Sequence, residues 1–274
     1  MIKKIKKFSE KITRKRLFIV IGVTVFCGLL GFFIYTREFS VLPDASVSLM
    51  KDIVEPTSSE RVMIISPHPD DETIAAGGYI QRAVNNGAAI RIVLVTDGNR
   101  RGKGAERHQE LVNATKTLGV NESDLKFLNL PEFYLNEKIS ESDLEKVLSK
   151  EINDFSPTVI MYPEEVDGNP DHKYIGNTMN GILKNIKIPN SYKYLVHWDY
   201  FPRPIGLKEN YNLTPPAKLV NFQKIWQRFM LTDAEENTKL DAVLSYKSQL
   251  KTPLLNKLLF SMVRKNELFD HFSQ

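Results

Sequence analysis

The sequence predicts an α/β fold, a mostly parallel sheet with helices on both faces, preceded by one N-terminal transmembrane helix. Three observations lead to this prediction. After Arg61, short apolar runs alternate with helix-compatible segments, which is typical of βαβ units. Histidine and acidic residues follow two of these runs directly, at the strand ends where α/β folds carry their chemistry. Residues 17–35 contain no charged side chain.

The first 35 residues form a basic segment and an apolar span. Residues 1–16 carry eight Lys or Arg and one Glu, and the 19 residues that follow are uncharged. A helix of about 20 apolar residues crosses the hydrocarbon core of a bilayer, and the basic side of such a helix stays in the cytoplasm. We therefore expect a single-pass cell-membrane protein with an extracellular C-terminal domain. A cleaved signal peptide is the alternative, but its apolar core is usually shorter.

The remaining chain is expected to hold a tether and one domain. Residues 36–60, which contain Pro43 and Pro56, have the composition of a tether, and residues 61–274 are long enough for a single core. The only cysteine is Cys27, so the outer domain has neither a disulfide nor a thiolate ligand. The net charge is +4, but the residues after 16 sum to −3, and we expect no nucleic-acid partner.

The alternating elements can be placed in order. Expected strands cover 61–66, 89–95, 125–130, 159–163 and 191–198, and expected helices cover 71–86, 105–118, 141–156 and 171–186. Residues 199–220, with four prolines, predict a long loop. Thr232 and Glu235 fit a capping box for a helix to about Leu250, and residues 254–269 predict an amphipathic closing helix. This order of elements is Rossmann-like.

The first motif is Ser66-Pro67-His68-Pro69-Asp70-Asp71-Glu72, at the end of the first expected strand. His68 and Asp71 are three residues apart where a helix begins, so both can face one cation. Asp70 lies between them and is free to act as a base on a water that the metal holds. The structural alternative is that these acids only stabilise the positive end of the helix dipole.

A third candidate ligand follows another strand about a hundred residues later. The run 159–163 leads into an acidic segment that ends in Asn169-Pro170-Asp171-His172. With His172 the set becomes two imidazoles and one carboxylate, which is the mixture found at catalytic zinc sites whose fourth position takes water. The sequence therefore predicts Zn²⁺ as the cofactor, bound by His68, Asp71 and His172.

These two segments resemble the signature of the PIG-L or LmbE-like de-N-acetylases, which is Pro-His-Pro/Ala-Asp-Asp/Glu followed later by His-Pro-Asp-His. The first segment matches in full at residues 67–71. The resemblance implies the same three zinc ligands and Asp70 as the general base. In the second segment Asn169 replaces the family's first histidine, which is thought to assist the transition state. Asn169 can donate a hydrogen bond but has no titrating proton.

Other polar residues are candidates for the same site. His197 lies at the end of the fifth expected strand. Because Asn169 cannot titrate, His197 is the candidate to protonate the leaving amine or to stabilise the oxyanion. A histidine beside a tryptophan is more often a packed residue. Arg107 matches a second family pattern and either contacts substrate or pairs with Glu110. Arg107, Asn169 and Asp171 are the expected substrate-binding residues, and Asp171 can also orient a neighbouring polar group.

The loop 96–104 contains three glycines and three cations and predicts a flexible, electropositive rim for the site. A solvated loop without a ligand is the commoner fate of such runs.

The predicted function is hydrolysis of the N-acetyl amide of an N-acetylglucosamine-type sugar by a membrane-anchored, zinc-dependent deacetylase, with Asp70 activating a zinc-bound water. The sugar specificity is implied by the resemblance alone. The expected substrate belongs to a cell-surface glycan, glycolipid or polysaccharide. The alternative is a catalytically impaired surface carbohydrate-binding protein on the same scaffold, which Asn169 favours. We expect no nucleotide cofactor, because the turn after the first strand is acidic and not glycine-rich.

Overall fold

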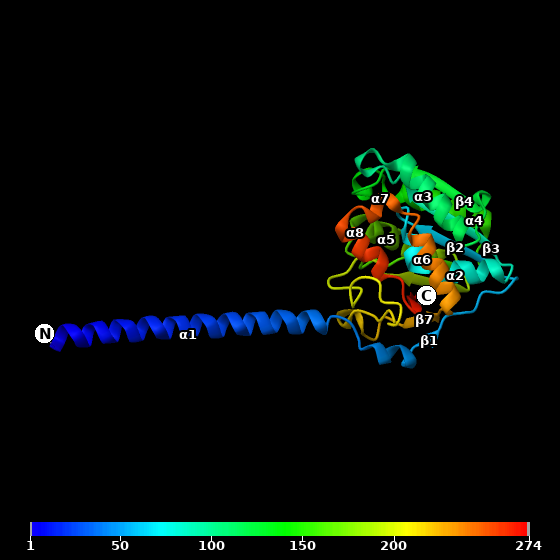
Figure 1. The fold of residues 1–274 in the computed structure, drawn as a ribbon. Coiled ribbons are helices and arrows are strands. Elements are labelled where there is room, and N and C mark those ends of the chain that lie inside the picture. The colour runs from blue at the N-terminus through cyan, green and yellow to red at the C-terminus, as the bar shows by residue number, and fades with distance from the viewer. Residues whose placement is uncertain (1, 273–274) are drawn as a thin grey trace. The chain divides into compact units, whose positions relative to one another are not determined.

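The structure is a computed structural model that describes residues 2–272, and the side chains of residues 2–14 and 38 lie outside the described part. The chain divides into two compact units, Met1–Ser40 and Val41–Gln274. The smaller unit is the helix α1 (Ile2–Glu38), and the larger unit contains a sheet with helices around it (Figure 1).

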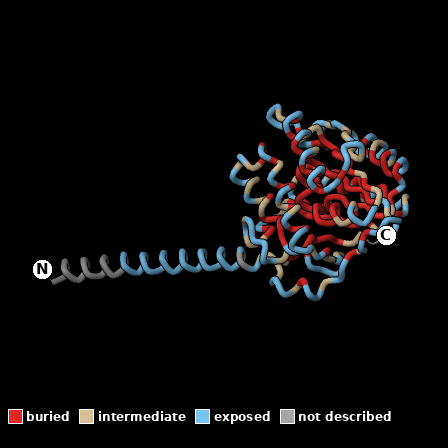
Figure 2. Tube along the Cα trace, turned by 45° about the vertical axis from the view of Figure 1, so that its right-hand side comes forward, coloured by how far each residue is buried: buried red, intermediate tan, exposed pale blue. Residues whose placement is uncertain are grey.

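Helix α1 contains the apolar span. Within the stretch Lys15–Arg37, an 18-residue window has a mean hydropathy of 2.7 and is 0% buried, and Figure 2 shows the described residues of this stretch exposed. By length and composition it can cross a membrane, so the expected apolar helix is confirmed. Most of the expected cytoplasmic basic segment, residues 1–16, lies outside the described side chains.

The described residues form an eight-stranded sheet in the order β1-β7-β8-β6-β5-β2-β3-β4. All neighbouring strands are parallel except at β8, which is antiparallel to both β7 and β6. The strands are β1 (Lys51–Asp52), β2 (Arg61–Ser66), β3 (Ala89–Thr96), β4 (Leu125–Leu130), β5 (Val159–Pro163), β6 (Asn190–Tyr194), β7 (Trp226–Met230) and β8 (Asn266–His271). The predicted mostly parallel sheet is confirmed.

Helices cover both faces of the sheet, as predicted. They are α2 (Asp71–Asn85), α3 (Gly104–Thr117), α4 (Glu141–Phe155), α5 (Pro170–Asn185), α6 (Asp233–Val243), α7 (Lys247–Leu250) and α8 (Pro253–Ser261). Shorter 3-10 turns lie at Asp44–Leu49, Arg100–Gly102, Glu122–Asp124, Leu135–Glu137 and Ala217–Leu219. The side chains of Ser140, Asn169 and Thr232 cap α4, α5 and α6 by accepting backbone N–H groups. The caps at Ser140 and Thr232 were expected, and the cap at Asn169 was not.

Two hydrophobic cores lie on the two faces of the sheet. In β2, Val62 and Ile64 belong to the core under α2, α3 and α6, whereas Met63 and Ile65 belong to the core under α4 and α5. Successive side chains of a strand point to opposite faces, so a strand that is apolar at every position is buried on both sides. Figure 2 shows this buried centre of the larger unit.

The C-terminal part differs from the prediction. The closing helix expected at 254–269 is wrong: α8 ends at Ser261, and Asn266–His271 is the strand β8 inside the sheet. Leu268 and Phe269 are the apolar residues of this strand, and its buried polar neighbours include Glu267 and Asp270. The strand therefore has no alternation of apolar and polar residues that distinguishes it from a helix. The helix expected to reach Leu250 breaks into α6 and α7, and β7 was not predicted. The fifth strand, expected at 191–198, ends at Tyr194.

Residues 41–60, expected in the tether, pack against the rest of the larger unit. The strand β1 pairs with β7 through Lys51 and Asp52. The side chains of Val47 and Ile53 are only 2% and 3% exposed.

A buried ion pair joins β8 to two helices. Lys239 Nζ of α6 lies 2.7 Å from Glu267 Oε1 of β8, and both side chains are 0% exposed. The Glu267 carboxylate also accepts the N–H groups of Gly78 and Tyr79, at 2.7 and 2.9 Å. These N–H groups follow Ala76, where the backbone of α2 is not helical. One carboxylate therefore satisfies a buried ammonium group and two buried amides.

We expect Glu267→Leu to lower the free energy of unfolding by about 3–5 kcal/mol, because it leaves the Lys239 ammonium group buried without its partner. Urea denaturation measures this loss. The matched control is Lys150→Met, which removes an ion pair with Asp154 between two exposed side chains and should have little effect. Equal losses in the two variants would contradict the role of Glu267.

Candidate active site

The first motif is the turn between β2 and α2. The Ser66 hydroxyl lies within hydrogen-bond distance of the His68 carbonyl, at 2.8 Å, and of Glu72 Oε2, at 3.0 Å. The His68 N–H donates to Asp71 Oδ2 at 2.9 Å. Asp70 has a φ of 138°, a conformation that is strained for a residue with a side chain and that clusters at functional sites. The turn is thus fixed by its own polar groups.

The second motif reaches the first because β5 pairs with β2 in the sheet. His172 lies in the first turn of α5. His172 Nε2 lies 3.0 Å from Asp71 Oδ2 and 3.2 Å from His68 Nδ1, and His68 Nδ1 lies 3.2 Å from Asp71 Oδ2. The three side chains are buried, with exposed fractions of 6% or less. The structure therefore brings together the three residues that the sequence singled out as ligands.

The outer nitrogen of each imidazole faces a carboxylate. His68 Nε2 lies 3.1 Å from Asp171 Oδ2, and His172 Nδ1 lies 3.5 Å from Asp167 Oδ2. A proton on each outer nitrogen leaves the inner nitrogens with lone pairs, an arrangement common around metal-binding histidines. Zinc bonds of about 2.0–2.1 Å put tetrahedral ligand atoms about 3.3 Å apart. The three inner atoms fit such an ion, and the charge and type of the donors fit it as well.

The electrostatics of this cluster also favour a cation. Burial disfavours the charged form of His68, but Asp171 and Asp71 outweigh it and raise the pKa of His68 to about 9. Burial likewise opposes charge on His172, whose pKa Asp71 and Asp167 raise well above its ordinary value. Three facing acceptor atoms require positive charge between them, which either protons or a metal ion can supply.

Asp70 lies beside the cluster and lines the adjoining cleft. Burial raises the pKa of Asp70 to about 8, and the Arg107 guanidinium opposes this rise. Arg107 Nη2 lies 3.7 Å from Asp70 Oδ2. The Asp70 carboxyl group is outside the triangle of ligand atoms. In its ionised form, which the charge of Arg107 favours, it can accept a proton from a molecule in the cleft.

Arg107 connects the loops around the site. Its guanidinium donates to the carbonyls of Gly98 and Pro69, at 3.2 and 3.3 Å, and to Glu132 Oε1 at 3.0 Å. The alternative pairing with Glu110 is wrong, because Glu110 instead accepts hydrogen bonds from Ser248. Gly98 has a φ of +59°, and a Cβ there would lie 2.9 Å from Pro69. Only glycine lets this loop approach the first motif so closely.

His197 lies at the same end of the sheet as the cluster. Its ring centroid is 4.9 Å from that of His172, in an edge-to-face arrangement. The His197 N–H donates to Asp167 Oδ2 at 2.9 Å, and its carbonyl accepts the Gly168 N–H. Burial and the neighbouring His172 lower the pKa of His197 to about 4. The ring is therefore neutral at pH 7, and one of its nitrogens can donate a hydrogen bond.

Asp171 and Asn169 differ in what they can reach. Asp171 is 1% exposed, and its carboxylate accepts the N–H groups of Phe133 and Leu135 as well as contacting His68. It therefore acts on a ligand only through His68. Asn169 lines the cleft, and its Oδ1 accepts the Asp171 N–H at 2.9 Å. This bond leaves the amide N–H₂ of Asn169 as a donor for the cleft.

Sequence reasoning missed Asp167 as a part of the site, whereas residues 131–134, which include Glu132, were expected to form a wall of the pocket. Asp167 is 2% exposed and accepts N–H groups from Asn169, Val196 and His197 in addition to facing His172. The available signal was the acidic segment before the second motif, but it holds several carboxylates. Which of them meets the imidazole depends on the packing of β5 beside β6.

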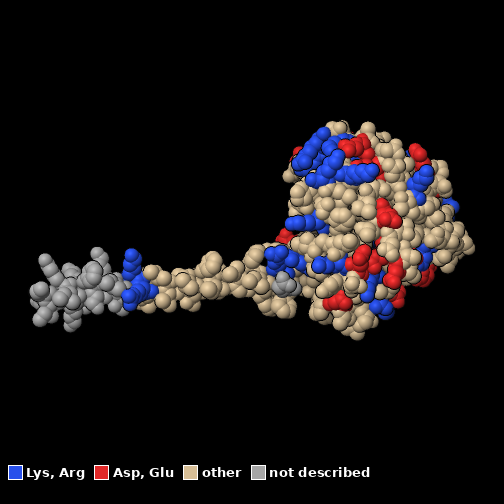
Figure 3. All heavy atoms as spheres, viewed as in Figure 1, with Lys and Arg blue, Asp and Glu red and all other residues tan. Residues whose placement is uncertain are grey.

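The cleft has a volume of about 520 Å³. Four cations at its rim, Arg100, Arg101, Lys103 and Lys251, make it electropositive, and Figure 3 shows Lys and Arg side chains gathered near the place where Figure 1 labels α7. The Arg100 guanidinium lies 4.5 Å from the centroid of the Phe133 ring. The rim that the loop 96–104 predicted is thus part of the cleft.

Comparison with known families places this site in context. Residues 63–182, which include both motifs, match the family model PIG-L, described as GlcNAc-PI de-N-acetylase.

Two curated relatives and one solved structure show the same likeness. A probable N-acetylglucosaminyl-phosphatidylinositol de-N-acetylase of Dictyostelium discoideum is 27% identical over 130 residues, which is 46% of this chain and 50% of the relative. The diacetylchitobiose deacetylase of Thermococcus kodakarensis is 26% identical over 157 residues, or 51% and 57% of the two chains. The deacetylase Dbv21, which acts on A40926 pseudoaglycone, superposes with a TM-score of 0.58 at 16% identity over 77% of this chain and 96% of its own.

These relatives are deacetylases, that is, hydrolases of amide C–N bonds. The match spans about half the length of the curated relatives, and the likeness to the solved structure is one of fold.

Proposed function

We propose that this chain, which carries a PIG-L family domain at residues 63–182, is a zinc-dependent hydrolase that removes the acetyl group from an N-acetylglucosamine-type sugar. One observation supports this proposal above the others. Ligand atoms of His68, Asp71 and His172 lie within 4.8 Å of one another, beside a cleft that Asp70 lines. The deacetylase relatives act on sugars of this type according to their names.

Each residue has a defined part in the proposed reaction. Bound at this cluster, Zn²⁺ supplies Lewis acidity, which lowers the pKa of water and polarises an amide carbonyl. Asp70 accepts the proton of the attacking water at its carboxylate. Arg107 fixes the Asp70 loop through the Pro69 carbonyl. The neutral ring of His197 and the amide of Asn169 are the candidate donors to the carbonyl oxygen as it gains negative charge.

The proton taken up by Asp70 can then pass to the leaving amine as the C–N bond breaks. This route needs no second titrating acid, so asparagine at position 169 is compatible with turnover. The alternative function, a catalytically impaired surface carbohydrate-binding protein, rests on the same substitution.

We further propose that α1 anchors the enzyme in the cell membrane, with residues 1–16 in the cytoplasm, residues 17–35 as the span, and a catalytic domain from about residue 61 to 274 outside the cell. The supporting observations are the length and hydropathy of the stretch Lys15–Arg37 and the basic residues before it. An outer position implies a cell-surface glycan, glycolipid or polysaccharide as substrate.

Asp70→Asn should lower kcat for acetate release by at least about 100-fold, because general base catalysis typically contributes a factor of this size or more. Zinc content should stay at the wild-type level, since Asp70 is outside the ligand triangle. The control is Asp241→Asn, at an exposed position of α6. An Asp70→Asn enzyme with wild-type kcat would remove the assigned base.

His172→Ala should reduce the zinc content of the purified protein, measured by inductively coupled plasma mass spectrometry, to a small fraction of the wild-type value. It deletes one of three ligands and leaves Asp71 with a single imidazole partner. His108→Ala, in α3 and outside the cluster, is the matched control. Unchanged zinc in His172→Ala would exclude this residue from the ligand set.

Protease added to intact cells should digest the C-terminal domain and leave an N-terminal fragment with α1. The readout is an immunoblot with tags at both ends of the chain, and permeabilised cells are the control for protease activity. Full protection of the domain in intact cells would reverse the proposed topology.

A further inference from the structure

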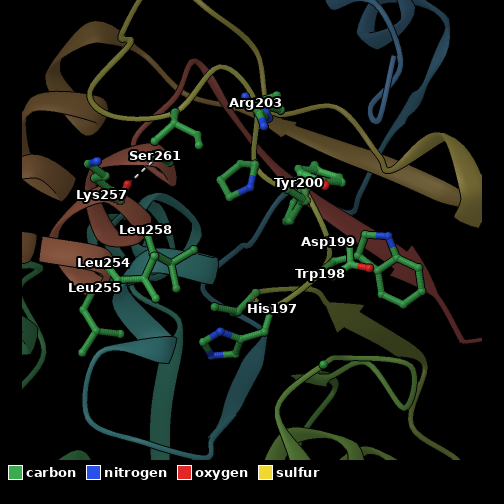
Figure 4. Close-up of a pocket in the computed structure, with 15 residues that line it drawn as sticks. His197, Trp198, Asp199, Tyr200, Arg203, Leu254, Leu255, Lys257, Leu258 and Ser261 are labelled. Carbon is green, nitrogen blue, oxygen red and sulfur yellow. Dashed lines mark hydrogen bonds between the residues drawn. The ribbon is translucent and has the colours of Figure 1, made fainter. Parts of the chain in front are cut away.

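The two most exposed apolar side chains of the larger unit lie outside the active site. Among its described residues, Phe222 and Leu49 have the largest exposed fractions of the large apolar side chains, 110% and 88%. The next is Leu254, at 78%, which lines a cavity beside the cleft together with His197 (Figure 4) and belongs to the site already described. Phe222 and Leu49 line neither the cleft nor this cavity, so the active site does not account for their exposure.

These two side chains belong to neighbouring segments, one before β1 and one before β7. The segments are joined where the Leu42 N–H donates to the Pro215 carbonyl at 3.0 Å. β1 and β7 are parallel neighbours at one edge of the sheet, and Figure 1 shows them together. Leu49 and Ile225 precede the paired residues and therefore lie at the same end of this strand pair. Ile225 is 47% exposed.

The exposed apolar side chains of the two segments form a surface that we call the apolar edge. Its members are Leu49, Val220, Phe222 and Ile225. Residues 219–223 contain no charged side chain. The acids of these segments are already engaged, because Asp44 accepts hydrogen bonds from Asn212, and Asp52 Oδ1 lies 2.8 Å from Arg228 Nε. Exposed apolar side chains gathered in this way mark a surface that contacts a protein or a membrane.

The length of the chain between α1 and the larger unit favours a membrane. The apolar stretch ends at Arg37, and the larger unit begins at Val41, whose backbone forms a bridge with Pro216. Four residues of extended chain reach at most about 14 Å. Tyr35 and Phe39, at this end of the stretch, are aromatic residues of the kind found at the headgroup level of a bilayer. If α1 spans a membrane, the segment that carries Leu49 begins within this short reach of the lipid.

We propose that the apolar edge docks on the membrane that α1 spans, with Leu49 and Phe222 inserted among the lipid headgroups. The inference rests on the proposed anchor and adds a second lipid contact, which α1 does not supply. Apolar side chains at the boundary of headgroups and acyl chains bind in proportion to the apolar area that they bury. The exposed Lys51 and Lys218, each two residues from a member of the edge, favour anionic lipids. Two contacts hold the cleft in a fixed orientation to the surface, whereas a single tether leaves the domain free to turn.

Fluorescence quenching of the full chain in nanodiscs tests this contact. The chain has one cysteine, Cys27, so Cys27→Ser combined with Leu49→Cys or Phe222→Cys provides a single site for an environment-sensitive NBD label. The discs contain phosphatidylcholine, phosphatidylglycerol and a phosphatidylcholine that carries a nitroxide quencher near its headgroup. Each label should lose most of its fluorescence, because docking puts it about 5–10 Å into the boundary of headgroups and acyl chains.

The matched control for the labels is Lys146→Cys in the same Cys27→Ser background. The Lys146 side chain is 71% exposed on α4 and is no part of the apolar edge, so a label there should keep its fluorescence. Quenching at positions 49 and 222 that is no stronger than at position 146 would overturn the docking.

A pair of double variants assigns the quenching to this surface. Leu49→Asp with Val220→Asp puts two charges in the apolar edge, and the label at Phe222→Cys should then keep its fluorescence. Leu244→Asp with Met230→Asp puts the same charges at two other exposed apolar side chains, 45% and 36% exposed, and the label should still be quenched. Equal quenching in the two double variants would overturn the assignment.

The native cysteine separates this inference from the proposed anchor. A label on Cys27 of the otherwise unchanged chain reports whether α1 lies in the bilayer, read with a nitroxide deep in the acyl chains. Quenching at Cys27 without quenching at positions 49 and 222 keeps the anchor and overturns the docking. Quenching at positions 49 and 222 without quenching at Cys27 keeps the docking and overturns the anchor. Unquenched labels that become shielded from water only when two copies share a disc would assign the edge to a second copy and overturn the lipid contact.

Discussion

The site depends on the close approach of three acceptor atoms in a buried space. The inner atoms of His68, Asp71 and His172 lie 3.0–3.2 Å apart, and unprotonated imidazoles and a carboxylate repel one another at that distance. The fold holds them there by placing β5 beside β2, so that two strand ends deliver their side chains to one point. The cluster is stable only with positive charge at its centre, and a divalent cation supplies that charge without protonating the ligands.

Two carboxylates outside the cluster fix the orientation of its two imidazole rings. Asp171 and Asp167 each face the outer nitrogen of one imidazole, and each also accepts backbone N–H groups from a neighbouring loop. The same two carboxylates therefore set the histidine tautomers and tie down the loops that form the cleft. Asp167 is central to this, because its bonds to the backbone fix the position of His197 relative to His172.

The sequence predicted the parts of the fold that follow from local patterns. The prediction failed where the conformation of a segment depends on the strands with which it pairs. The helices and strands between residue 61 and about residue 190 follow from alternation, caps and apolar runs. The strand at Asn266–His271 was not predicted because its residues, of which only Leu268 and Phe269 are apolar, gain strand geometry only by insertion between β7 and β6. In the site, His68, Asp71 and His172 could be found from spacing. The partners of Arg107 and the role of Asp167 could not, since they depend on which loops the strand order brings together.

Asn169 has a structural role at the start of α5 as well as a consequence for the chemistry of the site. Its Oδ1 caps α5 by accepting the Asp171 N–H, and this bond helps to fix the backbone of the residue that orients His68. Asparagine is among the preferred helix caps, so the substitution exchanges a titrating group for a firmer start of α5. In the proposed reaction, the chemistry that a histidine would supply there falls to groups already in the cleft. Asp70 can carry the proton in both directions, and the neutral ring of His197 can donate to the developing charge. In the proposed reaction, asparagine at this position therefore changes which residue donates, while the cluster of His68, Asp71 and His172 and the neighbouring Asp70 are retained.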